Sequence, residues 1–297
     1  MAILTASGLV KRFGKVTALD GVDLVVNKGE VYGFIGPNGA GKTTTIRILL
    51  GILQANAGNA TIFRRDVWKD AVEIHKGIAY VPGEVNLWPN LTGGEVIDLF
   101  VSLRGTNNNS RREELIAAFD LDPSKKCRTY SKGNRQKVAL VAAFASDADL
   151  YILDEPTSGL DPLMERVFQQ YVIEAKNAGS SVFLSSHILS EVEKLCDKVS
   201  IIRQGQIIES GSLDELRHLT RTGITVQTRQ QLASLVGVQG VHDIQEHGDM
   251  LSFHVDTEEL SNVITYLSKH DIIKLESAPP TLEDLFMRHY EGVGGAS

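Results

Sequence analysis

The chain has 297 residues, 42% of them hydrophobic and 23% charged, with a formal net charge of −7. This composition is ordinary for a globular protein and leaves room for one large domain and one small one. The negative charge argues against nucleic-acid binding, which usually needs a basic surface. No run approaches the roughly 18 apolar residues of a transmembrane helix, and no signal-peptide pattern opens the chain, so we expect neither feature. Cys127 and Cys196 have neither disulfide-framework nor metal-ligand spacing, which indicates reduced thiols in a cytosolic protein.

The first 53 residues predict several strands, a glycine-rich loop and a helix. Short strand patterns occupy residues 3–5, 18–19 and 22–26, and a compact apolar run follows at 31–35. After the loop, apolar residues at helical spacing predict a helix over 43–53. A strand, a loop and a helix in this order are the setting that a phosphate-binding loop requires.

The loop matches the pattern G-x-x-x-x-G-K-[ST]. Its glycines let backbone N–H groups turn toward a phosphate without Cβ clashes, and the following helix adds its positive N-terminal dipole. Lys42 would reach the β- and γ-phosphates, and the Thr43 hydroxyl would bind Mg²⁺. The loop therefore predicts binding of ATP or GTP with Mg²⁺. The predicted nucleotide contacts are Gly36, Asn38, Gly39, Gly41, Lys42, Thr43 and Thr44.

Strands and helices alternate in the middle of the chain. Residues from about 92 to 148 read as mainly helical, and apolar runs at 150–153 and 181–185 predict buried strands. Residues 162–178 predict a helix between these strands, and 199–209 a hairpin. This alternation indicates an α/β fold with a largely parallel sheet.

An acidic pair ends the predicted strand at 150–153. Asp154 follows four apolar residues and would lie at the carboxyl end of the strand, where open α/β sheets bind ligands. Asp154 is the candidate to support Mg²⁺, and Glu155 is the candidate to polarise or deprotonate an attacking water. Together with the loop, this pair predicts nucleotide hydrolysis.

The pattern changes after residue 219. The predicted elements are, in order, a strand at 224–228, a helix at 230–235, a hairpin of 241–246 and 250–255, a helix at 258–270 and a strand at 272–276. This is a split-βαβ, ferredoxin-like order. A last helix is expected at 281–290, and disorder from residue 292 onward.

Several ordered motifs make residues 3–215 resemble the nucleotide-binding subunits of ABC transporters. Residues 130–134, with the sequence YSKGN, are similar to the LSGGQ signature of that family and precede the acidic pair. Residues 156–161 resemble the D-loop of the family, and His187 resembles its switch histidine. Phe13 resembles the aromatic residue that stacks on adenine, which favours ATP over GTP.

The resemblance implies a domain organisation. Residues 1–218 would form a P-loop NTPase cassette with a mixed sheet core, an antiparallel β subdomain and a helical subdomain at about 92–148. Residues 219–297 would form a small C-terminal α+β domain with an accessory or regulatory role.

The resemblance also implies that two copies of the chain sandwich two ATP molecules. Ser131 and Gly133 of one copy would bind the γ-phosphate of the ATP that the other copy holds, and Asp161 would cross the dimer interface. His187 would donate a hydrogen bond to the γ-phosphate. Plainer roles stay open, because Ser131 and Gly133 could simply open a helix and Phe13 could be a core residue.

Two positions depart from the family pattern. Gly83 stands where the family usually has a glutamine that helps to hold Mg²⁺ and links hydrolysis to the membrane partner. The adjacent Glu84, or water, could fill that place. Lys132 replaces a glycine of the signature, and would either add a cation near the γ-phosphate or face solvent.

Two further segments resemble regions of partner contact. Residues 84–92 lie where the family meets the coupling helix of its permease, so Leu87 and Trp88 would be apolar anchors. The alternative is that Trp88 packs inside the domain. Residues 278–286 resemble the C-terminal extension of daunorubicin-resistance-type export ATPases, which would regulate the ATPase, pair two subunits or only add stability.

The function that the resemblance implies is that of the ATP-hydrolysing subunit of a drug or antibiotic exporter. It would act with a separate membrane permease and a second copy of itself, on the cytoplasmic face of the membrane, with ATP and Mg²⁺ and without nucleic acid. A non-transport ABC ATPase is disfavoured because the chain has one cassette, no long coiled-coil insertion and no basic excess. A catalytically weak regulatory module has only Gly83 and Lys132 in its favour.

Overall fold

The structure, a computed structural model, describes residues 1–105, 109–218, 221–229, 235, 237–278 and 283. The chain divides into two compact units, Met1–Ser210 and Gly211–Ser297. The helices predicted at 230–235 and 281–290 and the segment from residue 292 lie outside the described residues, apart from Leu235 and Glu283. In the described part of the chain, no helix combines the length and the apolar character that a bilayer crossing needs.

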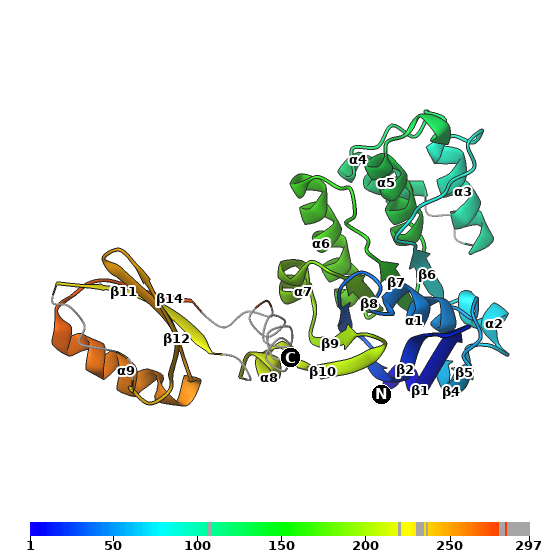
Figure 1. Cartoon of the computed structure of the whole chain (residues 1–297). Coiled ribbons are helices and arrows are strands. Elements are labelled where there is room, and N and C mark those ends of the chain that lie inside the picture. The colour runs from blue at the N-terminus through cyan, green and yellow to red at the C-terminus, as the bar shows by residue number, and fades with distance from the viewer. Residues whose placement is uncertain (106–108, 219–220, 230–234, 236, 279–282, 284–297) are drawn as a thin grey trace. The chain divides into compact units, whose positions relative to one another are not determined.

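The first unit contains two β-sheets (Figure 1). An antiparallel sheet has the strand order β2-β1-β4-β5, and a six-stranded sheet has the order β10-β9-β3-β8-β7-β6 with parallel pairing from β9 to β6. The strands are β1 (Ala2–Phe13), β2 (Val16–Asn27), β3 (Val31–Ile35), β4 (Ala57–Ile62), β5 (Arg65–Asp66), β6 (Ile78–Val81), β7 (Leu150–Asp154), β8 (Ser181–Ser186), β9 (Lys198–Arg203) and β10 (Gln206–Ser212). The predicted mixed core and antiparallel subdomain are confirmed.

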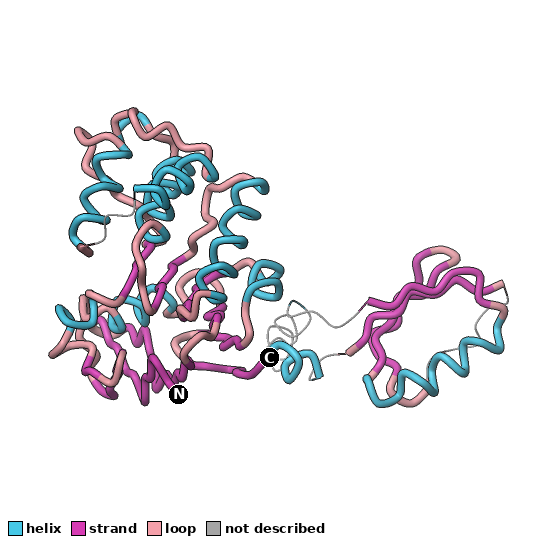
Figure 2. The backbone as a smooth tube through the Cα atoms, turned by 180° about the vertical axis from the view of Figure 1, so that it is seen from behind, coloured by secondary structure: helices cyan, strands magenta, loops and turns pink. Residues whose placement is uncertain are grey.

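Helices cover both faces of the six-stranded sheet, and a further group lies beyond its β6 edge (Figures 1 and 2). Helix α1 lies between the two sheets, α6 and α7 pack on the opposite face, and α3, α4 and α5 form the predicted helical subdomain. The helices are α1 (Lys42–Leu49), α2 (Ala71–His75), α3 (Gly93–Leu103), α4 (Asn109–Ala118), α5 (Lys132–Phe144), α6 (Pro162–Asn177) and α7 (Leu189–Leu195).

Strand β3 shows why the sheet is covered on both faces. All five of its residues are buried, and successive side chains point to opposite faces. Phe34 packs against Phe183 of β8 with ring centroids 5.5 Å apart, in a core shared with α1 and the antiparallel sheet. Gly33 faces α7, where an added Cβ atom would lie 2.7 Å from Val192. The strand that delivers the glycine-rich loop is therefore fixed from both sides.

The strands predicted at 3–5, 18–19 and 22–26 are too short, because β1 and β2 form one long hairpin. The pairing shifts register at several points, and Gly8 and Gly21 have φ values of 58° and 83° at two of them. Such bulges interrupt the alternation of apolar residues from which a strand is recognised.

The remaining differences in the first unit concern short elements. The sequence predicts nothing between residues 54 and 91, where β4, β5, α2 and β6 have only two to six residues each. The helix predicted over 43–53 ends earlier, at Leu49. The strands predicted at 150–153 and 181–185 and the helix at 162–178 are confirmed by β7, β8 and α6.

The second unit contains a four-stranded antiparallel sheet with the order β12-β13-β11-β14. Its elements are α8 (Leu213–His218), β11 (Thr222–Thr228), β12 (Val241–His247), β13 (Met250–Val255), α9 (Leu260–Leu267) and β14 (Ile272–Ala278). Val263 and Leu267 of α9 share a core with Ile224 and Phe253 of the sheet. The predicted small α+β fold is confirmed, although 3₁₀ turns take both ends of the helix predicted at 258–270.

Candidate active site

The glycine-rich loop joins β3 to α1 in a tight turn. An added Cβ atom at Gly36 would lie 2.3 Å from the carbonyl oxygen of Ile202, so only glycine fits there. Gly41 immediately precedes α1 with a φ of 117°, a conformation that side chains strongly disfavour. The loop backbone therefore ends at a helix N-terminus, the arrangement that favours an anion.

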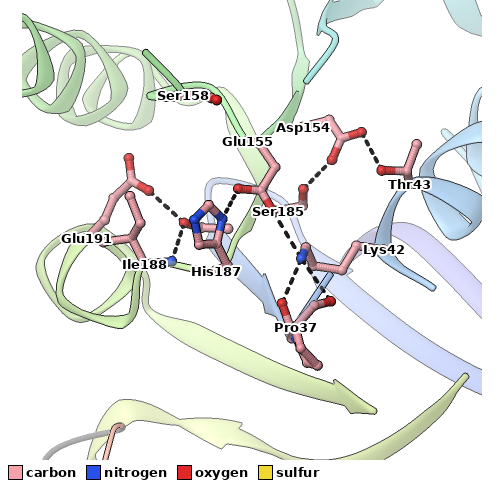
Figure 3. A network of polar contacts seen from close by, with 12 residues as sticks. Pro37, Lys42, Thr43, Asp154, Glu155, Ser158, Ser185, His187, Ile188 and Glu191 are labelled. Carbon is pink, nitrogen blue, oxygen red and sulfur yellow. Dashed lines mark hydrogen bonds and ion pairs between the residues drawn. The ribbon is translucent and has the colours of Figure 1, made fainter. Parts of the chain in front are cut away.

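Lys42 is buried at the base of the loop. Its ammonium group donates a hydrogen bond of 2.6 Å to the carbonyl oxygen of Gly36 and lies 3.0 Å from carboxylate oxygen Oε1 of Glu155 (Figure 3). The cation of the loop is thus in direct contact with the second acidic residue.

Asp154 lies at the end of β7 and is only 2% exposed. Its Oδ2 accepts a hydrogen bond of 3.0 Å from the Thr43 hydroxyl, and its Oδ1 accepts one of 2.5 Å from the Ser185 hydroxyl. The sequence analysis did not select Ser185, although a polar residue near the end of a buried strand is a signal for such a role. Two hydroxyl groups thus orient the carboxylate toward the loop.

Glu155 adopts a left-handed backbone conformation, with a φ of 50°. Its N–H donates to the carbonyl oxygen of Ser185 at 3.0 Å, which fixes this bend. One carboxylate oxygen of Glu155 meets Lys42, and the other contacts Nδ1 of His187 (Figure 3). Non-glycine residues in this conformation are uncommon and often occur at functional sites.

A cavity of about 450 Å³ brings the loop, the acidic pair and His187 together. It lies at the carboxyl ends of the parallel strands, as predicted for a ligand site in an open sheet. Predicted residues that line it are Asn38, Thr43, Gly83, Glu84, Asp154, Glu155 and His187. Its volume and its mixture of cationic, carboxylate and hydroxyl groups suit the binding of a phosphate chain next to a general base.

Gly83 lies directly beside the acidic pair. An added Cβ atom would lie 3.2 Å from the carbonyl oxygen of Asp154 and 3.6 Å from its carboxyl carbon. A longer side chain here would therefore enter the cavity, and glycine leaves that volume open. Tyr80 of β6 also lines this cavity, and burial, followed by the charge of Asp154, raises the pKa of Tyr80 to about 12.

The signature segment lies against the D-loop of the same chain. Ser131 caps α5 by accepting a hydrogen bond of 3.2 Å from the N–H of Asn134. The Lys132 ammonium donates to the Ser158 hydroxyl at 2.7 Å, and a Cβ atom at Gly133 would lie 2.4 Å from the carbonyl oxygen of Gly159. Lys132 is exposed to solvent, as one of its two predicted roles requires, and it contacts Ser158, which lines the cavity, without lining the cavity itself.

Asp161 and Phe13 also lie away from this cavity. The Asp161 carboxylate caps α6 by accepting hydrogen bonds of 3.0 Å from the N–H groups of Leu163 and Met164. Phe13 ends β1 and is 50% exposed, with the Lys11 ammonium 5.2 Å from its ring centroid. Its exposure excludes the alternative of a core phenylalanine.

Glu191 is a buried carboxyl group next to His187 that the sequence analysis did not select. It is 5% exposed and accepts a hydrogen bond of 2.8 Å from the Ser186 hydroxyl. Burial raises its pKa to about 7, against the opposing effect of the Ser186 and Thr157 hydroxyl groups. Glutamate at the start of a short helix gives no sequence signal for this environment.

A second, larger cavity of about 620 Å³ forms a groove among α2, β6, α3 and α5. Leu87 lines it, and the neighbouring Trp88 is 52% exposed with its ring 6.2 Å from that of Phe100. Trp88 is therefore not packed inside the domain. The lining of this groove also includes the basic residues His75, Lys76 and Arg104 and the apolar residues Ile52, Val72, Val96 and Leu103.

Two family models match the chain. The ABC transporter model matches residues 19–158, and the model for the C-terminal domain of DrrA1-3-like ATP-binding proteins matches residues 211–290. A solved structure described as the ATP-binding subunit of an ABC transporter has a TM-score of 0.68 and 32% identity, covering 73% of this chain and 92% of that chain.

Full-length relatives agree with these matches. The chain is 32% identical to the uncharacterized ABC transporter ATP-binding protein YhaQ of Bacillus subtilis (strain 168), over 96% of this chain and 97% of that protein. It is 30% identical to the bacitracin transport ATP-binding protein BcrA of Bacillus licheniformis, over 96% of each chain. It is 33% identical to the daunorubicin resistance ATP-binding protein DrrA3 of Streptomyces coeruleorubidus, over 96% and 94%. The chain belongs to the ABC transporter ATP-binding proteins, the ATP-hydrolysing subunits of these transporters, and carries a DrrA-like C-terminal domain.

Proposed function

We propose that this chain powers a drug or antibiotic exporter by hydrolysing ATP in the cavity between the glycine-rich loop and the acidic pair. The supporting observation is that Thr43, Asp154, Glu155 and His187, which come from separate segments, line one cavity. Relatives named for bacitracin transport, daunorubicin resistance and linearmycin resistance favour a drug-like cargo.

In this proposal, each residue around the cavity has its own role in hydrolysis. Lys42 binds the β- and γ-phosphates, and backbone N–H groups of the loop between Asn38 and Thr44 donate to them. Glu155 accepts a proton from the attacking water, and His187 donates a hydrogen bond to the γ-phosphate. The exposed ring of Phe13 offers a surface on which adenine stacks.

The residues at the acidic pair fit Mg²⁺. Thr43 and Asp154 supply a hydroxyl and a carboxylate oxygen, the hard donors that this ion prefers, and the two groups already contact each other at 3.0 Å. Bound there, Mg²⁺ would offset the charge of the β- and γ-phosphates. Gly83 leaves space beside Asp154 for water, and Glu84 lines the same cavity.

A second copy of the chain completes each site in this proposal. Ser131 and Gly133 lie outside the cavity of their own chain, so they would reach the γ-phosphate held by the partner copy. The start of α5 offers a helix N-terminus for that phosphate. Asp161 would lie at the interface between the copies, while it caps α6 within its own chain.

We propose that the membrane permease binds in the groove among α2, β6, α3 and α5. It combines an apolar lining with the basic groups of His75, Lys76 and Arg104, and guanidinium nitrogen Nη1 of Arg104 is buried without a hydrogen-bond partner in the described part of the chain. An amphipathic helix that carries an acidic side chain would fit both properties. In this proposal, the chain acts on the cytoplasmic face of the membrane, beside a separate permease. Residues 219–297 would act as an accessory or regulatory domain.

Reconstitution with a permease tests this function. The chain would be co-expressed with a candidate permease, purified as a complex and placed in proteoliposomes with ATP outside. We expect ATP-dependent uptake of labelled bacitracin, daunorubicin or linearmycin, abolished by Glu155→Gln. ATP turnover in the presence of the permease but without transport would instead indicate a non-transport ATPase, and ATP binding without turnover a regulatory module.

A further inference from the structure

We propose that Glu191 is a positioning residue that ties the His187 segment to the D-loop, so that its protonation state sets how His187 meets the γ-phosphate. This inference rests on the roles proposed above for Glu155 and His187. No contact of Glu191 with the nucleotide is involved, because its carboxyl group is buried behind the cavity.

Glu191 first contacts the segment that carries His187. The Ser186 hydroxyl donates to Oε2 of Glu191 at 2.8 Å, and Oγ of Ser186 in turn accepts a hydrogen bond of 3.0 Å from the N–H of Ile188 (Figure 3). The residues directly before and after His187 are therefore held through one hydroxyl group that Glu191 orients. Moving Glu191 would move the backbone on both sides of the histidine.

Glu191 also faces the D-loop. The buried Thr157 hydroxyl faces the Glu191 carboxyl and lowers its pKa. The preceding residue, Pro156, is fixed from elsewhere, because its carbonyl oxygen accepts a hydrogen bond of 2.9 Å from the buried Gln136 amide of α5. Glu191 thus lies between the D-loop, which the helix that starts at the signature contacts, and the segment that carries His187.

The charges around Glu191 favour its neutral form. Burial raises its pKa, and so do the acidic groups of Glu165 on α6 and Glu155 at the end of β7. The buried thiol of Cys196 and the imidazole of His187 are further titratable groups near Glu191. Oxygen Oε1 has no hydrogen-bond partner in the described part of the chain. A protonated Oε1 can donate a hydrogen bond to the Thr157 hydroxyl, and an ionised one can accept a hydrogen bond from it.

Ionisation keeps the Ser186 and Thr157 hydroxyl groups as donors to the carboxylate, but it adds a negative charge beside Glu155 and the γ-phosphate. That charge weakens the alignment of His187 with a phosphate. A plain structural role makes a different prediction, because a residue that only holds the start of α7 would affect stability and leave the pH dependence of hydrolysis unchanged.

The test is the pH dependence of ATP hydrolysis in the full chain between pH 5.5 and 8.5. Wild type, Glu191→Gln, Glu191→Ala and the control Glu193→Gln are compared, because Glu193 lies on the same helix and outside the contact with Ser186. We expect kcat/KM of the wild type and the control to fall through an inflection near pH 7 that Glu191→Gln lacks. Glu191→Ala should lower kcat by about tenfold at every pH.

Further variants distinguish a failure of the role proposed for Glu191 from a failure of the role proposed for Glu155. In a His187→Ala background, Glu191→Gln should have no additional effect, since Glu191 acts through His187. The proposal is overturned if Glu191→Gln keeps the inflection, or if its effect is undiminished without His187. The assigned role of Glu155 fails separately if Glu155→Gln still hydrolyses ATP. Thermal unfolding verifies that each variant folds, and if Glu191→Ala does not, the profile of Glu191→Gln decides.

Discussion

Lys42 and Glu155 are paired with each other: the ammonium nitrogen lies 3.0 Å from a carboxylate oxygen, and the two side chains are 6% and 19% exposed. Lys42 also donates to the carbonyl oxygen of Gly36. A phosphate that enters the loop competes for the same ammonium. Phosphate binding and the release of Glu155 from Lys42 are therefore coupled, so the proposed general base becomes available when the substrate arrives.

Replacing Lys42 with alanine should weaken ATP binding. Loss of a charged hydrogen bond costs about 1.5–3 kcal/mol, so the Kd for ATP should rise by about tenfold to a hundredfold. Isothermal titration with a non-hydrolysable ATP analogue measures this change. Lys269→Ala, at an exposed lysine of the second unit, is the matched control and should bind like the wild type. Unchanged affinity in Lys42→Ala would refute the assigned role of the loop.

Glu155→Gln should bind ATP at least as tightly as the wild type and lose turnover. The amide no longer holds Lys42 by charge, which favours phosphate, but it cannot accept the proton of water. We expect kcat to fall by about a hundredfold or more. Steady-state hydrolysis tests the predicted loss of turnover, and the ATP Kd, measured on the same preparation, tests the predicted retention of binding. Near-normal hydrolysis would show that another group activates the water.

Mixing two inactive variants tests whether the sites are shared between copies. Lys42→Ala and Ser131→Asp should each hydrolyse ATP poorly, and their mixture should regain activity, because a mixed dimer contains one intact site. Aspartate keeps the cap that Ser131 provides to α5, so the folded start of that helix is retained. Activity that does not recover on mixing would argue for sites contained within one chain.

The groove should be needed for binding the permease and not for folding of the chain. Leu87→Asp places a charge in the apolar lining and should abolish co-purification with the permease, while basal ATP hydrolysis by the isolated chain persists. Ile173→Asp, at a residue of α6 that is 46% exposed and outside the groove, is the control. If Leu87→Asp still co-purifies like the control, the permease contacts another surface.

Glu191 should make the folded state less stable as pH rises. Its pKa is raised from 4.5 to about 7, so between these values the folded chain keeps a proton that the unfolded chain releases. The contribution of the neutral carboxyl to stability is present below pH 4.5 and is lost as pH rises through 7. Urea unfolding between pH 5 and 8 should show Glu191→Gln gaining up to about 3 kcal/mol relative to the wild type. An equal difference at all pH values would contradict the raised pKa.

The glycine-rich loop and the acidic pair could be recognised from sequence because short local patterns define them. Each pattern combines a buried strand with the functional residue that directly follows it, and no distant contact is needed. By contrast, the hydrogen bonds of Ser185 to Asp154 and of Ser186 to Glu191 depend on how β8 lies beside β7 and how α7 packs. Those contacts exist only after folding, and the residue types involved are common on any surface.

The hairpin of β1 and β2 illustrates a different limit. Its bulges at Gly8 and Gly21 interrupt the alternation that predicts a strand, although the backbone continues through them. The location of Lys132 also could not be predicted, because its contact with Ser158 joins segments that are far apart in sequence. Spacing along the chain therefore indicates the nucleotide chemistry better than it indicates how the motifs contact one another.

The left-handed backbone at Glu155 has a consequence for protein engineering. Glutamate in this conformation costs about 1 kcal/mol or more relative to glycine, and asparagine tolerates it better as well. A search for thermostable variants that monitors only folding would therefore favour glycine or asparagine here and remove the carboxylate from the cavity. At this position a substitution that raises stability lowers turnover. Variant libraries designed to raise thermal stability should therefore leave Glu155 unchanged.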